Sequence, residues 1–393
     1  MKRIEYKRLN PPERTLIGTD LSNASPRARQ GLIACLQGAT DPSFLDVLNL
    51  AQDLLRDLWR TENQDTFIFP GTEEAGMEAV LVNLLEPDDI ALVGVAGYGG
   101  QRLADAAERT GARVIRLEVS PGHVIPDAMV EAALKVHKPR LVGLVHGEAS
   151  TGVHQSLANI ARLAHQNGAL CVADVCSTTA LVEVKVDEWG LDACWSGSQK
   201  GLSAYPGLAL VTFGTRAADT VRQRKTPVRS YYFELDGLRS FAKDERRHQT
   251  FPAPLLYALT EVLQLAYEQS MTYRVSRHIN RRDALVAALE TLGLEVLAPP
   301  ENRLASSVVV LVPNGIDADK LRQGLLTPYR LDVGSGLGAL KGKALRFGIQ
   351  SHSAQPGFLI QAVAVLEYLL AEQGYTVPKP GAAVDKLLGL LDP

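Results

Sequence analysis

Four groups of polar residues come just after short apolar runs of the sequence, where strands are expected to end. Asp174 follows ALCVA, and Lys200 ends the SGSQK segment that follows LDACW. Residues 146–152, HGEASTG, follow LVGLV, and residues 71–76, GTEEAG, come after TFIF. Ligands of open α/β sheets bind beyond the carboxyl ends of the strands, so these residues are the first candidates for a site.

A lysine and a carboxylate at neighbouring strand ends suit the chemistry of pyridoxal 5′-phosphate (PLP). The PLP aldehyde needs an amine, and its pyridine nitrogen needs an anion that keeps it protonated. Lys200 is the candidate amine and Asp174 the candidate anion. A lysine displaced by substrate can also move a proton as general base and acid. Taken alone, each residue has an ordinary explanation, as a solvated lysine or as an aspartate that caps a helix.

The elements that must position these residues alternate along the chain. Short β-rich runs separated by amphipathic helical stretches are typical of a mainly parallel sheet covered on both faces. The sequence therefore predicts a doubly wound α/β domain. We expect its strands at 66–69, 90–97, 112–119, 139–147, 169–175, 191–197 and 208–214, with helices through 77–85, 101–111 and 157–168.

A long basic amphipathic stretch at 273–293 has apolar positions at helical spacing, and we expect it to bridge two domains. The β-rich and helical segments beyond it predict a smaller α+β domain. We therefore divide the chain into an N-terminal arm at 1–23, a large cofactor-binding domain at 24–272 and a small C-terminal domain at 273–393.

The composition favours small-molecule chemistry. The chain has 393 residues, of which 46% are hydrophobic and 22% charged, and its formal net charge is -3 with the basic residues scattered. This balance argues against a nucleic-acid or anionic-membrane partner. We expect a cytoplasmic protein, because no apolar run resembles a leader or a membrane span. The four cysteines form no C-x-x-C pair, and we expect no metal site.

A series of motifs resembles that of class V aminotransferases, especially the alanine:glyoxylate and serine:glyoxylate branch. The motifs are HGEASTGV, VADVCSTTAL, SGSQKGLSAYPG and LGALKGKALRFG, within a similarity that runs from about Leu16 to Leu370. The resemblance implies a fold-type I PLP-dependent transferase that acts as a homodimer with shared active sites. It also implies transfer of an amino group from a small amino acid, such as alanine or serine, to a 2-oxo acid such as glyoxylate or pyruvate.

The resemblance assigns roles to residues that match the family motifs. Lys200 would hold PLP as a Schiff base, with Asp174 at the pyridine nitrogen and Ser150 near the ring oxygen. Arg346 would clamp the substrate α-carboxylate, since a guanidinium can donate two parallel hydrogen bonds to that planar anion. Ser22 and Asn23 lie in the segment that lines the family's substrate pocket.

Further matches concern the cofactor phosphate. Ser198 and Gln199 resemble contacts to the phosphate and the ring, and Thr72 lies in a turn that opens a helix, where phosphates bind. Thr250 matches a threonine that the partner subunit presents to the phosphate. Arg247 stands where relatives have a tyrosine facing the same group.

The pattern departs from the family at two places around the cofactor. Glu73 and Glu74 replace the usual Gly and Thr or His beside the phosphate, where carboxylates are unfavourable unless they occupy the first turn of a helix. Gly99 stands where relatives have an aromatic residue over the ring, and Tyr98 lies one residue earlier.

Two other functions stay open at this point. A PLP-dependent β-lyase would use the same fold, whereas a desulfurase is disfavoured because no cysteine lies beyond Cys194. A non-catalytic scaffold or binding protein with a degenerate cofactor site is the alternative from another class.

Overall fold

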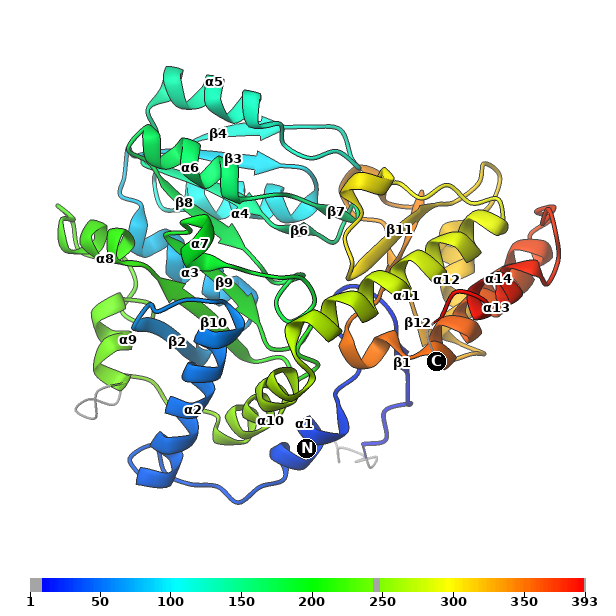
Figure 1. Cartoon of the computed structure of the whole chain (residues 1–393), viewed down its shortest axis with the longest axis horizontal. Helices are drawn as coiled ribbons and strands as arrows, with labels where there is room; N and C mark the ends of the chain where they lie inside the picture. Colours follow the sequence, from blue (N-terminus) through cyan, green and yellow to red (C-terminus); the bar gives the residue numbers. More distant parts are fainter. Residues whose placement is uncertain (1–8, 243–247, 392–393) are drawn as a thin grey trace, which may run out of the picture.

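The structure, a computed structural model, describes residues 9–242 and 248–391 of the chain. A large part is built on a seven-stranded sheet, and a smaller part on a three-stranded one (Figure 1). Within the described residues, no helix has both the length and the apolar character needed to cross a membrane.

The large sheet has the strand order β2-β10-β9-β8-β5-β3-β4. β10 runs antiparallel to both of its neighbours, and the other six strands share one direction, so the prediction of a mainly parallel sheet is confirmed. The antiparallel orientation of β10 was not predicted. The strands are β2 (Asp65–Pro70), β3 (Ile90–Val95), β4 (Arg113–Glu118), β5 (Leu141–Val145), β8 (Leu170–Asp174), β9 (Ala193–Gly197) and β10 (Leu208–Phe213).

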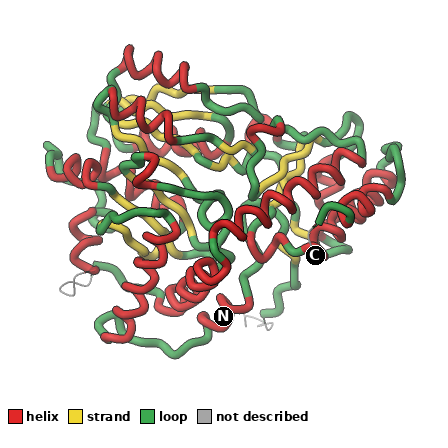
Figure 2. Tube along the Cα trace, in the orientation of Figure 1, coloured by secondary structure: helices red, strands yellow, loops and turns green. Residues whose placement is uncertain are grey.

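Helices cover both faces of this sheet (Figure 2). Along β10, Leu210 contributes to the core on the face of α2, α5, α6 and α10, whereas Val211 contributes to the core on the opposite face, with α3, α4 and α9. This alternation is why strands buried on both faces read as continuous apolar runs. The helices are α1 (Pro26–Leu32), α2 (Pro42–Leu58), α3 (Glu73–Leu84), α4 (Tyr98–Arg109), α5 (Asp127–His137), α6 (Ala158–Gln166), α7 (Val186–Trp189), α8 (Thr215–Arg222), α9 (Leu235–Ala242) and α10 (Ala253–Gln269).

The smaller part combines residues from both ends of the chain. β1, in the segment expected to be an arm, pairs in parallel with β12, and Ile17 is buried in the small core. Its helices and strands are β1 (Thr15–Leu16), α11 (Met271–Thr291), β11 (Ser307–Leu311), α12 (Ala318–Leu326), β12 (Leu331–Asp332), β13 (Gly334–Ser335), β14 (Ala344–Gly348), α13 (Pro356–Glu372) and α14 (Ala382–Leu388), with the 3-10 turns η1 (Pro300–Asn302), η2 (Gly338–Leu340) and η3 (Ser351–Ala354). In the large part, a short hairpin of β6 (Gly147–Glu148) and β7 (Val153–His154) follows β5.

Helix α11 connects the two parts, as Figure 1 shows. It starts directly after Ser270, which adopts a positive φ of 61° and caps the helix by accepting a hydrogen bond from the Tyr273 amide. One turn later, the buried Arg274 donates to the carbonyl oxygens of Ala180 and Gly201 and to the Ser351 hydroxyl. The bridge is therefore anchored to loops of the large part and to η3.

The carboxyl ends of the central strands are aligned with one another. Val145, Asp174 and Trp195 pair side by side on β5, β8 and β9. Helix α3 approaches this edge closely because residue 76 is glycine, and a Cβ there would lie 3.1 Å from the Trp195 Cβ. The N-terminus of α3 and the loops after β5, β8 and β9 consequently meet around one space.

Replacing Arg274 with methionine should destabilise the protein by about 2–4 kcal/mol, because two buried carbonyl oxygens and the partly buried Ser351 hydroxyl would lose their donor. The measurement is the urea midpoint of unfolding. Arg109→Met on the exposed side of α4 is the control and should change stability by less than about 0.5 kcal/mol. Equal effects of the two substitutions would contradict an anchoring role for Arg274.

Candidate active site

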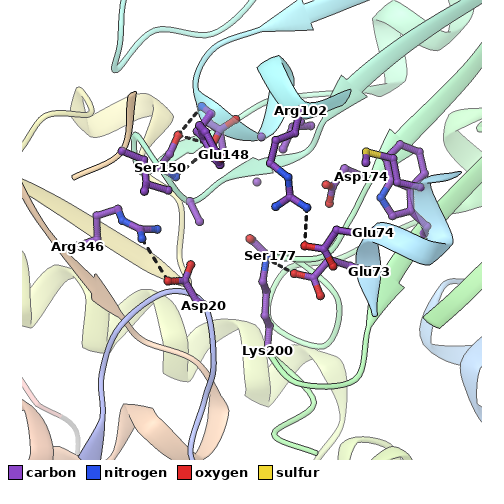
Figure 3. Close-up of a pocket in the computed structure, with 18 residues that line it drawn as sticks. Asp20, Glu73, Glu74, Arg102, Glu148, Ser150, Asp174, Ser177, Lys200 and Arg346 are labelled. Carbon is purple, nitrogen blue, oxygen red and sulfur yellow. Dashed lines mark hydrogen bonds and ion pairs between the residues drawn. The ribbon is translucent and has the colours of Figure 1, made fainter. Parts of the chain in front are cut away.

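A pocket opens at the carboxyl ends of the central strands. Figure 3 shows side chains from the large and the small part converging on it. Its polar lining residues are Asp20, Glu73, Glu74, Tyr98, Arg102, Glu148, Ser150, Asp174, Ser177, Lys200 and Arg346, and its apolar ones include Met77 and Trp195.

Lys200 lies in a tight loop between β9 and β10. The amide of Ser203, which has a positive φ of 57°, donates to the Lys200 carbonyl oxygen, and the Ala204 amide donates to Ser198. The Ser22 hydroxyl donates to the Lys200 carbonyl at 2.8 Å. These bonds hold the backbone while the lysine side chain extends into the pocket.

The Lys200 ammonium is paired with Glu73. Its Nζ lies 3.4 Å from Glu73 Oε1, and the two side chains are only 15% and 13% exposed. The amide Nε2 of Gln199 donates to the other oxygen of the same carboxylate. Burial alone would lower the pKa of Lys200, but the nearby carboxylates, chiefly Glu73, outweigh it and raise that pKa, so the amine is charged at neutral pH.

Asp174 ends β8 and faces the same pocket. Its Oδ1 accepts a hydrogen bond from the Cys176 amide at 2.8 Å. Burial raises the pKa of Asp174, and the charge of Lys200 offsets this only in part. An acid whose pKa is perturbed by burial thus lies in the interior beside a cation, a combination typical of functional sites.

Ser150 and Glu148 organise the N-terminus of α4. The Glu148 carboxylate accepts hydrogen bonds from the Gly100 amide and from the amide and hydroxyl of Ser150. The Ser150 oxygen in turn accepts from the Tyr98 amide at 2.8 Å. A buried acid at a helix N-terminus is stabilised by the helix dipole.

Glycine at position 99 follows from the place of Glu148. A Cβ on Gly99 would lie 2.8 Å from Glu148 Oε2, so a larger residue there would require the Glu148 carboxylate to shift. Tyr98 lines the pocket instead and is 41% exposed.

Glu74 is neutralised by a separate set of partners. It accepts hydrogen bonds from the Thr72 hydroxyl and from Arg102, which reaches across from α4 (Figure 3). Burial acts against its charge, but these bonds outweigh burial and lower the pKa of Glu74. Both glutamates lie in the first turn of α3, where acids are favourable.

Arg346 reaches the pocket from β14 in the small part and is only 3% exposed. It donates to the Ser335 carbonyl at 2.6 Å, to the Thr19 hydroxyl and, across 3.3 Å, to the Asp20 carboxylate. Asp20 itself is largely exposed, with 75% of its side chain accessible. The Asp20 carboxylate is therefore an anion that another anion could replace, and it lies beside the Arg346 guanidinium, which is held in place by the protein.

Comparisons with known proteins agree with this geometry. The model of the aminotransferase class-V family matches residues 41–347, most of the chain. The chain belongs to the class-V aminotransferase family. The predictions of family, fold class and enzyme type are confirmed.

Relatives of this class-V aminotransferase are similar over nearly their whole length. A (S)-ureidoglycine--glyoxylate transaminase of Bacillus subtilis is 32% identical over 93% of this chain and 92% of its own, and a solved structure of that enzyme has a TM-score of 0.94 over 98% and 99% of the two chains. The alanine--glyoxylate aminotransferase of Rattus norvegicus is 34% identical over 88% and 85%. A structure of an alanine--glyoxylate aminotransferase from Nostoc sp. is 35% identical, with a TM-score of 0.92 over 94% and 98%.

Several residues predicted for the aminotransferase's site lie elsewhere in the structure. Ser22 does not line the pocket, because its hydroxyl is bonded to the backbone of Gln199 and Lys200. Asn23 binds Leu16 and Ser353 and lines a different cavity, between the N-terminal segment and the small part. Substrate contact by either residue stays a prediction.

Two residues predicted near the phosphate have other surroundings in this chain, and a third cannot be placed. The Ser198 hydroxyl donates to the Tyr205 carbonyl within the lysine loop and does not line the pocket. Thr250 is exposed and lies outside the pocket of its own chain. Arg247 lies outside the described residues.

Four residues of the pocket were not singled out from the sequence as site residues. Glu148 lies inside the HGEAST motif, which was the available signal, and Ser177 follows Asp174 within VADVCS. Arg102 and Asp20 gave no signal of their own, because their partners Glu74 and Arg346 are 28 and 326 positions away.

Replacing Asp174 with asparagine should raise the free energy of unfolding of the cofactor-free protein at pH 7, because burial disfavours the charged carboxylate and asparagine carries no charge. A raised folded pKa means that wild-type stability is greatest below the unfolded pKa, near 3.8, and falls as pH rises through the folded pKa. The gain from asparagine should therefore shrink as pH is lowered toward 4. The measurement is the urea midpoint at both pH values, with Asp57→Asn on the exposed side of α2 as control. A gain that does not depend on pH would contradict this origin.

Proposed function

We propose that this aminotransferase moves an amino group between a small amino acid and a 2-oxo acid such as glyoxylate or pyruvate, through a PLP-type cofactor held by Lys200. The observation that carries the proposal is the convergence of the Lys200 amine and the Asp174 carboxylate on one pocket from adjacent strands. The relatives named above support glyoxylate as acceptor and alanine or ureidoglycine as donor.

The residues present fit the pyridoxal ring. Members of the family typically use PLP, and its ring needs an amine, a buried anion for its nitrogen and a polar partner for its ring oxygen. Lys200, Asp174 and Ser150 supply these groups around the pocket. When bound, the ring withdraws electrons from the substrate Cα, which no side chain of the protein does.

The phosphate end fits less well. The first turn of α3, where backbone amides would face a phosphate, carries the carboxylates of Glu73 and Glu74. The carboxylate of Glu73 already bonds to Gln199, the residue expected on the phosphate side. The site therefore accommodates the pyridoxal ring, whereas the carboxylates of Glu73 and Glu74 would repel the phosphate.

The chain's own side chains supply binding and proton transfer. Arg346 would bind the substrate carboxylate through its two terminal nitrogens once Asp20 gives way. The Lys200 amine, freed from its bond to the cofactor, would take a proton from the substrate Cα and would return it at the C4′ carbon, on the other side of the nitrogen. Asp174 would hold the proton on the ring nitrogen.

The described cysteines near the sheet do not support a sulfur-transfer reaction. Cys171, Cys176 and Cys194 are buried, and burial raises the pKa of each thiol, so none is a thiolate at neutral pH. A homodimer with shared sites remains part of the proposal. It is supported by Thr250, which is exposed and matches a threonine that relatives present to their partner.

With a pyridoxal cofactor supplied, the wild type should form product only when both an amino acid and an oxo acid are present. Alanine with glyoxylate is the first pair to test, with the appearance of pyruvate and glycine as the measurement. Lys200→Ala should lower kcat by a factor of about 10² to 10⁴, because the proton-transfer group is lost. Lys341→Ala, at an exposed position, is the control. Consumption of the amino acid without any oxo acid would indicate a β-lyase instead.

Replacing Asp20 with asparagine should lower KM for the amino acid about threefold while kcat changes little. The exposed carboxylate competes with substrate for Arg346, and its solvent exposure limits the effect. Steady-state kinetics at low ionic strength provide the measurement, and Arg346→Lys should raise KM. A higher KM in Asp20→Asn would mean that Asp20 contacts the substrate directly.

A further inference from the structure

The phosphate end of the pocket already contains an anion that belongs to the chain. Glu73 lies in the first turn of α3, and Thr72, at the N-cap, makes no side-chain capping bond to the helix. The Glu73 carboxylate accepts from Gln199 Nε2 with one oxygen and lies 3.4 Å from Lys200 Nζ with the other. It therefore takes the partners and the helix-end position that a bound phosphate would otherwise take.

The charge of the pocket opposes a second anion at this end. Five carboxylates line the pocket and three cationic side chains face them. Arg102 is paired with Glu74 and Arg346 with Asp20, which leaves Lys200 as the one pocket cation available to Glu73 among the described residues. A phosphate adds a further charge of about -1.5 to -2 at neutral pH. It would have to displace Glu73 or bind beside it, and like charges a few ångström apart repel strongly in a buried site.

The carboxylate of Glu73 also indicates which group fits at this end of the pocket. Glu73 lines the pocket, and Gln199, a residue only 4% exposed, holds it by donating to one of its oxygens. A carboxylate accepts hydrogen bonds and donates none. A hydroxyl group can donate to Glu73, whereas a fully ionised phosphate has no proton to give. The Glu73 carboxylate therefore favours a neutral alcohol over a phosphate ester.

We propose that this site binds the phosphate-free vitamers pyridoxal and pyridoxamine in preference to their 5′-phosphates, with the Glu73 carboxylate accepting the hydrogen bond of the 5′-hydroxyl. The inference rests on the proposed function, because Lys200 and Asp174 serve the same ring in both. It makes Glu73 the residue that selects the form of the cofactor.

The test compares the affinities of the purified, cofactor-stripped protein for pyridoxal, pyridoxamine and PLP, measured by calorimetry and by visible absorbance. We expect pyridoxal to bind at least about tenfold more tightly than PLP, a ratio that corresponds to about 1.4 kcal/mol. Glu73→Gln keeps the size of the side chain and removes its charge. It should strengthen PLP binding by about tenfold or more, with a smaller change for pyridoxal.

Glu78→Gln is the matched control, because Glu78 lies on the same helix with its side chain exposed. It should leave all three affinities unchanged. A thermal melt of each variant checks that the fold is intact.

The outcomes separate the inference from the proposed function. Tighter binding of PLP than of pyridoxal by the wild type, or an unchanged preference in Glu73→Gln, would overturn the inference and leave the proposed function standing. Failure to bind any of the three compounds would overturn both. A wild-type preference for pyridoxal that Glu73→Gln reverses would establish Glu73 as the selecting residue.

Discussion

A buried ammonium group is stable inside a protein only when anions lie close to it, because the interior solvates charge poorly. Lys200 meets this requirement through Glu73 at 3.4 Å and through Asp174 at the end of the neighbouring strand. The order of the strands brings the two acids and the lysine to one edge of the sheet. Close packing of α3 on β9 at Gly76 completes the arrangement. The same pairing keeps the amine charged, so a bound aldehyde must compete with Glu73 for it.

Carboxylates of the protein itself occupy the positions of the pocket that favour an anion. Glu148 lies at the N-terminus of α4, Glu73 and Glu74 at that of α3, and Asp20 beside Arg346. Glu73, Glu74 and Glu148 are each held by two or more contacts, whereas the exposed Asp20 is held by one. Selection at such a site depends on which acid can be displaced. Charge, rather than pocket size, then distinguishes one ligand from another.

The sequence predicted well those features that depend on neighbouring residues. Continuous apolar runs indicated the strands, and the polar residue after each run placed Lys200 and Asp174 at their ends. The strand direction of β10 was missed, because a strand buried on both faces has the same composition in either direction. The hydrogen bonds of Ser22 to the Lys200 carbonyl and of Asn23 to Ser353 were not foreseen, because the partners are far away in sequence. Arg102 and Asp20 were missed since their partners are distant in sequence.

The lysine loop takes its hydrogen bonds from two distant stretches of the chain. Ser22 donates to the Lys200 carbonyl, and Arg274 donates to that of Gly201 one residue later. During synthesis from the N-terminus, Ser22 emerges long before the loop, and Arg274 emerges more than seventy residues after it. The loop therefore lacks part of its support until the start of α11 has left the ribosome. The reactive amine acquires its final setting late, when the bridge between the two parts is already being made.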